Sequence, residues 1–373
     1  MTQDIARLCA AAGIGTELLM GRNALKNGFD GIGALGRRAL IVTGRNSARL
    51  CGALDDLTGL MSAAGMTYVV FDGITENPRL SDCRAAAALA ASEGCDLVVG
   101  IGGGSPLDAA KAIAFLACRS YDDDGLFFAD ALCGRLPLVL IGTTAGTGSE
   151  ITAVSVLTQK DGTKRTFKHD KNLPDISVLD PKYTYSAGVN TAISTALDAF
   201  MHAAEGYLSV GCSAVAAEAA ELALPAVYEY IKLLCGGGYA DESDKDEAYY
   251  ASILAGVTLY ICGTQFPHPL GYVLTESYGV PHGRACAVFL PALLKAMEAG
   301  DNDKVSDFEA LLGGSLEDIS AVIAKAALVE VSIPEADIQA LRGRFTNLPH
   351  YEKTPGGFDV DEALGVYREL FGR

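Results

Sequence analysis

The sequence lacks the features that mark several classes of protein. No run of 18 or more apolar residues is free of charges and turn residues, so we expect no transmembrane helix and no membrane partner. The first residues, MTQDIARLCAAAG, carry an acid where a secretory signal has a basic segment, which predicts a cytoplasmic protein. Lys and Arg number 29 against 46 Asp and Glu, and a net charge of −17 repels a phosphate backbone, so nucleic acid is not an expected partner.

Cysteine is present at ten positions, but no two of these positions form a CxxC pair. A zinc-thiolate site and a disulfide framework are therefore not indicated. We interpret the cysteines as reduced, mostly buried small hydrophobic residues. Histidine is scarce, with five residues, which gives weight to any cluster of histidines in the chain.

The first half of the chain alternates short β-branched runs with alanine-rich helical segments. The expected strands lie in RRALIVT (37–43), MTYVVFDGI (66–74), DLVVGIGGG (96–104), LPLVLIGTT (136–144) and ISVLDP (176–181). Strands separated by helices of this length pair in parallel, which predicts a wound α/β sheet.

The second half reads as one helix after another. We place a domain boundary near residue 185, with an α/β dinucleotide-binding domain over residues 1–184 and an all-helical, metal-binding and catalytic domain over residues 185–373. The polar stretch GGGYADESDKDE (236–247) is expected to be a loop between two helices.

A cluster of potential metal ligands lies in the helical half. Asp198 and His202 are four residues apart, so on a helix they share one face. His268 and His282 follow, each between apolar residues and Pro or Gly, where a solvated histidine has little reason to be. One carboxylate and three imidazoles suit a borderline transition metal and contain too much nitrogen for calcium or magnesium. The alternatives are a helix-surface hydrogen bond, a closed structural metal site and satisfied core histidines.

Two glycine-rich turns in the first half suit a phosphate. A buried-type strand ends in Gly102, Gly103, Gly104 and Ser105, and a helix begins at once, so free backbone N–H groups face outward. This turn is not a complete GxGxxG fingerprint, and a simple tight turn is its alternative. The run GTTAGTGSEIT (142–152) follows another apolar strand and adds hydroxyl groups and backbone donors. Two such turns in one sheet favour a dinucleotide site.

The motifs GGGSPLDAAK, TTAGTGSEIT, the Asp-x-x-x-His helix with AEGYLS, and HPLGY with PHG together resemble the iron-containing, group III alcohol dehydrogenase family over nearly the whole chain. The resemblance implies a Rossmann-like N-terminal domain and a helical C-terminal domain, the dehydroquinate synthase-like fold, with a catalytic cleft between them. It implies NAD(P)-linked hydride transfer to or from a small alcohol, diol or aldehyde, iron or alternatively zinc, and a homodimer or larger homo-oligomer.

The resemblance also assigns residues to roles. It places the metal ligands on Asp198, His202, His268 and His282. It places the cofactor contacts on Gly102, Gly103, Gly104, Ser105, Asp108, Thr143, Thr144, Thr147, Thr152 and Lys164.

Two positions depart from the family pattern. Many members have a histidine four residues after the third metal ligand, where this chain has Tyr272, which either donates a hydrogen bond in catalysis or lines the pocket. Where NAD-preferring relatives carry an acid at the end of the first strand, this chain has Gly44, followed by Arg45 and Asn46. Without the acid a 2′-phosphate is not repelled, so we expect a preference for NADP(H). If Arg45 points to solvent, NAD(H) would serve as well.

Three alternative functions differ in what they require of the sequence. A dehydroquinate synthase-like lyase handles an anionic substrate and needs several basic residues near the metal, whereas only Arg284 is adjacent here. A zinc polyol dehydrogenase of the glycerol type has one aspartate and two histidines, and the fourth ligand argues against it. A non-enzymatic nucleotide-binding protein would leave the metal ligands without a purpose.

Overall fold

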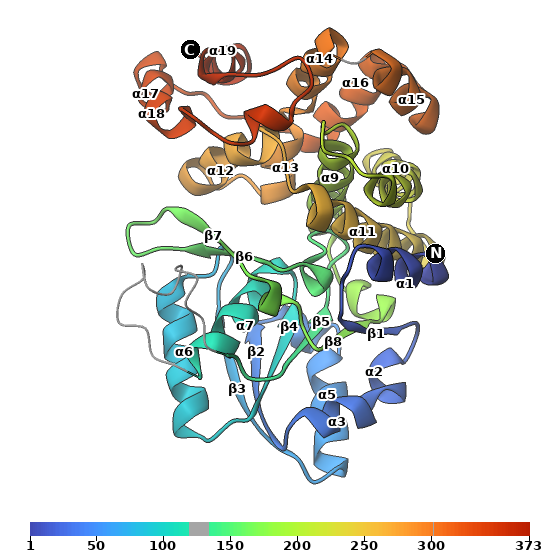
Figure 1. Cartoon of the computed structure of the whole chain (residues 1–373), viewed down its shortest axis with the longest axis vertical. Coiled ribbons are helices and arrows are strands. Elements are labelled where there is room, and N and C mark those ends of the chain that lie inside the picture. Colours follow the sequence, from blue (N-terminus) through green and yellow to red (C-terminus); the bar gives the residue numbers. More distant parts are fainter. Residues whose placement is uncertain (119–133, 301) are drawn as a thin grey trace. The chain divides into compact units, whose positions relative to one another are not determined.

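The computed structural model describes residues 1–118, 134–300 and 302–373. The chain divides into two compact units (Figure 1). The first contains Met1–Gly188 and Lys245–Ile253, and the second contains Val189–Asp244 and Leu254–Arg373. Among the described residues, no helix is both long and apolar enough to cross a membrane.

The first unit contains a six-stranded, entirely parallel sheet in the order β1-β8-β5-β4-β2-β3. Its strands are β1 (Glu17–Met20), β2 (Arg38–Gly44), β3 (Thr67–Ile74), β4 (Leu97–Gly102), β5 (Leu138–Gly142) and β8 (Ile176–Leu179). The five expected strands and the parallel pairing are confirmed. Sequence analysis missed the four-residue β1 and the antiparallel hairpin of β6 (Val154–Thr158) and β7 (Lys164–Lys168).

Both faces of the inner strands β2, β4, β5 and β8 are covered, which explains why these strands are mostly apolar. Alternate residues of one strand serve opposite faces, so Leu40 and Val42 enter one core while Ala39 and Ile41 enter the other. The first core is closed by α6 (Leu80–Ser92), α7 (Gly104–Leu116) and the β6–β7 hairpin. The second is closed by α2 (Ala24–Asn27), α3 (Phe29–Leu35), α4 (Ser47–Leu50) and α5 (Ala53–Ala63). Helix α1 (Thr2–Ala11) precedes the sheet.

The strand order creates a switch point between β2 and β4. From β2 the chain proceeds outward to the edge strand β3, and it then returns to the other side of β2 to form β4. The segments that leave the carboxyl ends of β2 and β4 therefore diverge, and in open α/β sheets ligands bind in the crevice at such a point. Gly44 ends β2 and Gly102 ends β4, so both sequence segments assigned to the cofactor begin here.

The second unit is helical within the residues that the structure describes. Its main helices are α9 (Val189–Tyr207), α10 (Ala214–Cys235), the ends of α11 (Glu242–Cys262), α12 (Pro267–Tyr278), α13 (His282–Ala287), α14 (Leu290–Gly300), α15 (Asn302–Leu312), α16 (Leu316–Ala327), α17 (Glu335–Ala340), α18 (Arg342–Phe345) and α19 (Val360–Phe371). Helix α9 packs against α10 and α13, and α13 packs in turn against α12 (Figure 1). This arrangement gathers α9, α12 and α13, which carry the predicted metal ligands.

The expected loop over residues 236–247 is too long. Helix α11 already begins at Glu242, where the Asp241 carboxylate caps the first turn and the Asp244 carboxylate accepts from the Asp241 N–H. Acids in the first turn also interact favourably with the helix dipole. The polar composition that suggested a loop is that of a helix N-terminus.

Candidate functional site

Helix α9 presents Asp198 and His202 on one face, one turn apart. Both are buried, with 3% and 5% of their surface exposed, among apolar neighbours such as Phe200 and Met201. The Nε2 atom of His202 lies 3.7 Å from Oδ1 of Asp198. The spacing of four residues thus produces the predicted convergence.

Two further helices bring His268 and His282 to the same oxygen. His268 lies in the first turn of α12 and His282 begins α13. The Nε2 atoms of both imidazoles lie 3.6 Å from Oδ1 of Asp198. Two ligands bound to one tetrahedral ion at about 2.1 Å are roughly 3.4 Å apart. The four predicted residues therefore lie together at separations that fit a single divalent metal.

The hydrogen bonding of these residues also fits a metal. Oδ1 of Asp198 and Nε2 of His268 are buried and have no hydrogen-bond partner. A buried carboxylate oxygen without a partner costs free energy unless it binds a cation. The donor set of one carboxylate and three imidazoles suits iron or zinc.

Glycine permits the close helix packing that the site requires. A Cβ atom on Gly283 would lie 1.8 Å from the backbone oxygen of Ser194, and one on Gly271 would lie 2.7 Å from that of Ala285. Any larger residue would push α13 away from α9 or from α12. The glycine after His282 in the PHG motif therefore allows its imidazole to approach Asp198.

Buried polar residues behind His268 fix its orientation, and sequence analysis did not identify them. Oε1 of Glu205 lies 2.6 Å from Nδ1 of His268, while its Oε2 accepts from the backbone N–H of Gln265 at 2.7 Å. The Gln265 amide donates to the Glu205 backbone oxygen and accepts from the Thr354 hydroxyl. A carboxylate on the far nitrogen of a ligating histidine sets its tautomer and raises its basicity. The signal in the sequence was a second acid on the helix of Asp198, three residues after His202 and flanked by apolar residues and glycine.

The charges of the site shift the pKa values of its members in opposite directions. Burial opposes ionisation of Asp198, but the adjacent imidazoles of His202 and His282 outweigh it and hold its pKa well below the ordinary range. Burial likewise opposes the charge on His268, yet electrostatic interactions with the Cys286 sulfur and the Glu205 carboxylate raise its pKa. Burial also raises the pKa of Glu205, against the opposing charge of His268. The site therefore favours positive charge beside Asp198, which a divalent ion supplies.

Tyr272 occupies the position of the missing family histidine, one turn after His268. Its ring stacks on His282, with centroids 5.7 Å apart and an interplanar angle of 21°. The His282 side chain is the most exposed of the four predicted ligands, at 31%. Burial raises the pKa of Tyr272 to about 12, so at neutral pH the phenol keeps its proton and can donate a hydrogen bond.

In the first unit, the two glycine-rich turns lie side by side. The N–H of Thr143 donates to the Gly102 oxygen at 2.9 Å. A Cβ atom on Gly103 would lie 3.1 Å from the Thr144 side chain, and one on Gly104 would lie 2.8 Å from that of Thr147. Gly102 itself has a φ of +156°, which L side chains rarely adopt.

This cradle fits a dinucleotide phosphate. Helix α7 begins at Gly104, so the backbone N–H groups of its first turn are available to an anion. The Thr143 hydroxyl oxygen is buried and has no hydrogen-bond partner. The Ser105 hydroxyl accepts from the backbone N–H of Asn77 at 3.3 Å.

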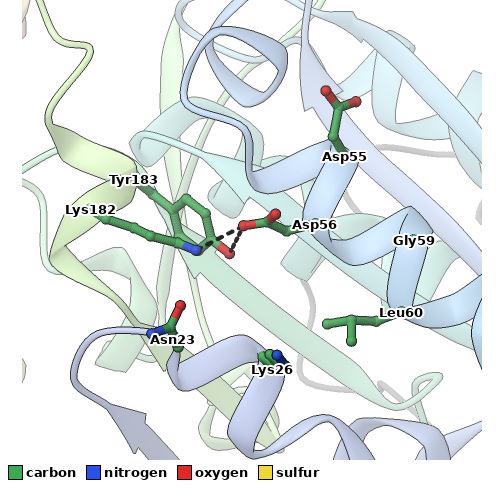
Figure 2. Close-up of a pocket in the computed structure, with 8 residues that line it drawn as sticks. All are labelled: Asn23, Lys26, Asp55, Asp56, Gly59, Leu60, Lys182 and Tyr183. Carbon is green, nitrogen blue, oxygen red and sulfur yellow. Dashed lines mark hydrogen bonds and ion pairs between the residues drawn. The ribbon is translucent and has the colours of Figure 1, made fainter.

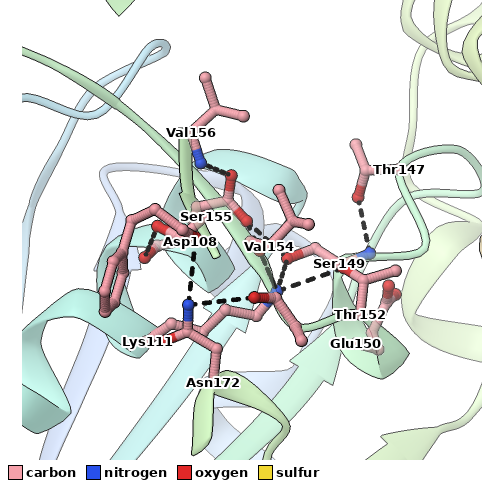
Figure 3. A network of polar contacts seen from close by, with 12 residues as sticks. Asp108, Lys111, Thr147, Ser149, Glu150, Thr152, Val154, Ser155, Val156 and Asn172 are labelled. Atoms are coloured by element: carbon pink, nitrogen blue, oxygen red, sulfur yellow. Dashed lines mark hydrogen bonds and ion pairs between the residues drawn. The ribbon is translucent and has the colours of Figure 1, made fainter. Parts of the chain in front are cut away.

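A buried polar network fixes the second turn and the hairpin against α7 (Figure 3). The Lys111 ammonium, fully buried, donates to the Ser149 hydroxyl at 2.8 Å and to the Val154 oxygen at 2.7 Å. Asp108 accepts from the Ser149 hydroxyl at 2.7 Å and from the N–H of Val156 at 2.8 Å. Asp108, which the resemblance assigns to the cofactor, thus contributes to the structure of the loop. Lys111 was missed because a lysine in an alanine-rich helix reads as a surface residue.

The remaining predicted cofactor residues lie on several segments of the first unit. Thr152 accepts from Lys111 at 3.5 Å, and Lys164 begins β7. Arg45 and Asn46 are exposed directly after β2, where Gly44 is half-buried. They therefore lie on the segment that leaves β2 at the switch point.

A separate cavity of the first unit, of about 310 Å³, does not coincide with the predicted cofactor residues (Figure 2). In its wall, Asp56 accepts from the Lys182 ammonium at 2.9 Å and from the Tyr183 hydroxyl at 3.0 Å. The charged side chains of this cavity therefore balance one another, and none of its lining residues is a predicted cofactor contact.

Comparison with known proteins places the chain in a family. Residues 15–181 match the model of iron-containing alcohol dehydrogenases, and residues 192–336 match the C-terminal model of the Fe-containing alcohol dehydrogenase family. The chain belongs to the iron-containing alcohol dehydrogenase family. It is thus an oxidoreductase that couples alcohols to a nicotinamide dinucleotide, and its family implies iron and NAD(H) as cofactors.

Individual relatives agree with this assignment. The chain is 31% identical to a 1,3-propanediol dehydrogenase of Citrobacter freundii, over 81% of this chain and 79% of the relative. It is 30% identical to long-chain-alcohol dehydrogenase 1 of Geobacillus thermodenitrificans, over 92% and 85% of the two chains. A crystal structure of an iron-containing alcohol dehydrogenase from Thermotoga maritima superimposes with a TM-score of 0.88, at 33% identity, over 95% of this chain and 98% of that one.

Proposed function

We propose that this chain interconverts small alcohols or diols and their aldehydes, uses NADP(H) in preference to NAD(H), and holds a divalent metal in its helical unit. The proposed ligands are Asp198, His202, His268 and His282. One observation carries the proposal: three imidazole nitrogens lie within 3.7 Å of a single buried carboxylate oxygen that has no hydrogen-bond partner.

The reaction transfers a hydride between the alcohol carbon and the nicotinamide ring. When bound, the metal supplies Lewis-acid polarisation of the substrate oxygen. The Glu205 carboxylate lies on Nδ1 of His268, so Nε2 is the nitrogen that would bind the ion beside Asp198 once its proton has been released. Tyr272 covers one side of the exposed His282 ring and retains its phenol proton, which makes it a hydrogen-bond donor at this edge of the site.

The proposed preference for NADP(H) depends on the end of β2. Gly44 provides no carboxylate to accept from a ribose 2′-hydroxyl or to repel a 2′-phosphate. Arg45 follows it and is exposed, and a guanidinium can bind a phosphate with two parallel hydrogen bonds.

A relative named as a 1,3-propanediol dehydrogenase supports small diols as the substrate class, and one named as a lactaldehyde reductase supports small aldehydes. Because one relative is a 1,3-propanediol dehydrogenase and another a long-chain-alcohol dehydrogenase, we propose testing short diols first and longer alcohols as competitors.

We further propose a cytoplasmic homodimer. The nine cysteines that the structure describes are free thiols, which suits a reducing compartment. Sedimentation of the purified protein would test the dimer.

The function is tested with protein loaded anaerobically with ferrous iron or with zinc, by following oxidation of NADPH and NADH with a series of short aldehydes. We expect turnover with NADPH, and loss of turnover in His268→Ala. His169→Ala, which removes a histidine from the first unit, serves as the matched control and should remain active. If neither metal supported turnover with either cofactor, the proposal would be contradicted.

A further inference from the structure

Cys286 lies among the predicted metal ligands, although its sequence context is that of a buried apolar residue. It follows His282 by one helical turn in α13 and is fully buried. Its Sγ lies 3.7 Å from Nδ1 and 3.8 Å from Nε2 of His282. The donor atoms of Asp198, His268, His282 and Cys286 all lie within 4.8 Å of one another.

Direct coordination requires the Cys286 or the His282 side chain to turn, because Sγ is nearly equidistant from both nitrogens of the ring and so lies off the line of the Nε2 lone pair. A sulfur at about 2.3 Å and a nitrogen at about 2.1 Å from one ion are roughly 3.1 Å apart at an angle of about 90° and roughly 3.6 Å apart at the tetrahedral angle, which is close to the present separation. The sulfur shares its surroundings with two buried atoms that have no hydrogen-bond partner, Oδ1 of Asp198 and Nε2 of His268. These two atoms point to a cation at the same place.

We propose that Cys286 is a further protein ligand of the metal centre, which extends the set of one carboxylate and three imidazoles by one thiolate. This inference rests on the proposed function. When the ligand binds, the S–H bond is replaced by a sulfur–metal bond and the proton is released to solvent. With five protein ligands bound, an ion with six coordination positions would keep one position for the oxygen of a small substrate.

A thiolate changes which metal the site prefers. Soft sulfur ligands favour zinc over the harder ferrous ion relative to a site of nitrogen and oxygen alone. We therefore expect Cys286→Ala to lower the ratio of zinc affinity to iron affinity by roughly tenfold or more. Competition with a chelator, measured separately for the two metals, gives this ratio without any assay of activity.

Cobalt provides a direct test, because cobalt bound to thiolate has a sulfur-to-metal charge-transfer band in the near ultraviolet in addition to its visible bands. We would titrate the metal-free, full-length protein anaerobically with cobalt. The wild type should show both sets of bands, and Cys286→Ala and Cys286→Ser should keep only the visible ones. Cys83→Ala, which removes another fully buried cysteine in the first unit, is the matched control and should behave as the wild type.

The outcomes separate this inference from the proposed function. Visible bands without a charge-transfer band in the wild type would overturn the role of Cys286 and leave the four-ligand centre intact. Absence of all cobalt bands would overturn both. Should the variants fail to fold, X-ray absorption on the zinc-loaded wild type decides the question, because a bound thiolate appears as a sulfur scatterer at about 2.3 Å.

Discussion

The Glu205 carboxylate lies 2.6 Å from Nδ1 of His268, and both side chains are almost fully buried. This contact fixes the imidazole so that its other nitrogen faces Asp198, 3.6 Å away. Glu205 belongs to the same helix as Asp198, so a single helix supplies both a predicted metal ligand and the group that orients another.

We expect Glu205→Gln to weaken metal binding by about 10- to 100-fold, because an amide carries no negative charge and replaces one of the two acceptor oxygens, which face His268 and Gln265, with a donor. Affinity is measured by competition with a chromophoric chelator. The thermal stability of the metal-free protein is the control, since a residue with a purely structural role would lower that stability while leaving the affinity of the folded protein unchanged. Unchanged affinity would contradict the positioning role.

Removal of the metal should destabilise the protein. An ion that binds only the folded state at one hundred times its Kd contributes about 2.7 kcal/mol to the free energy of unfolding. Addition of ferrous iron or zinc to chelator-treated protein should therefore raise the temperature of unfolding, and His202→Ala should lose most of this response. If the metal had no effect on the wild type, the predicted ligands would not hold an ion in the folded state.

Sequence analysis predicted those parts of the fold and of the site that show in the spacing of residues or in their immediate neighbours along the chain. Asp198 and His202 were predicted as metal ligands from a spacing of four, and His268 and His282 from the scarcity of histidine and their Pro and Gly neighbours; the structure brings these four side chains together. Glu205 was not identified, because its role depends on the approach of a segment sixty residues away, at Gln265.

Other features were missed for related reasons. The strand β1 is only four residues long, and the β6–β7 hairpin has alternating polar residues that resemble a surface loop. Cys286 was interpreted as a small hydrophobic residue because sequence shows burial but not which atoms meet. Lys111 looks like a surface lysine until the hairpin packs on α7 and encloses its ammonium.

The proposed preference for NADP(H) can be tested by placing an acid at the end of β2, where this chain has Gly44. Gly44→Asp should lower the ratio of kcat/KM for NADPH to that for NADH by about 10- to 100-fold, since one hydrogen bond to a charged group is worth about 1.5–3 kcal/mol. The added Cβ would lie 3.3 Å from the Ile74 oxygen, so only a small adjustment is needed. Arg45→Ala should weaken binding of NADPH and leave NADH unaffected. Equal ratios in all three proteins would show that this segment does not contact the 2′ position.

The buried Glu150 predicts a pH dependence of stability. Burial raises the pKa of Glu150 from 4.5 to about 7, so between these values the folded protein holds a proton that the unfolded chain has released. Its contribution to stability is therefore complete below pH 4.5 and declines as the pH rises to 7, by a total on the order of 3 kcal/mol. Glu150→Gln retains an oxygen to accept from the Tyr249 hydroxyl and cannot ionise.

Glu150→Gln should accordingly be more stable than the wild type at pH 7 and should lose less stability between pH 5 and pH 7. Urea unfolding at several pH values measures both. Burial lowers the pKa of Lys111 to about 8 against the raising effect of the Asp108 and Glu150 charges, so Lys111 titrates mainly above this pH range. Parallel pH profiles for the two proteins would mean that Glu150 ionises with its ordinary pKa. For a buried carboxylate to have an ordinary pKa, a nearby positive charge must offset its burial. Lys111, whose charge lowers the pKa of Glu150, would then have to interact with it more strongly than the structure shows.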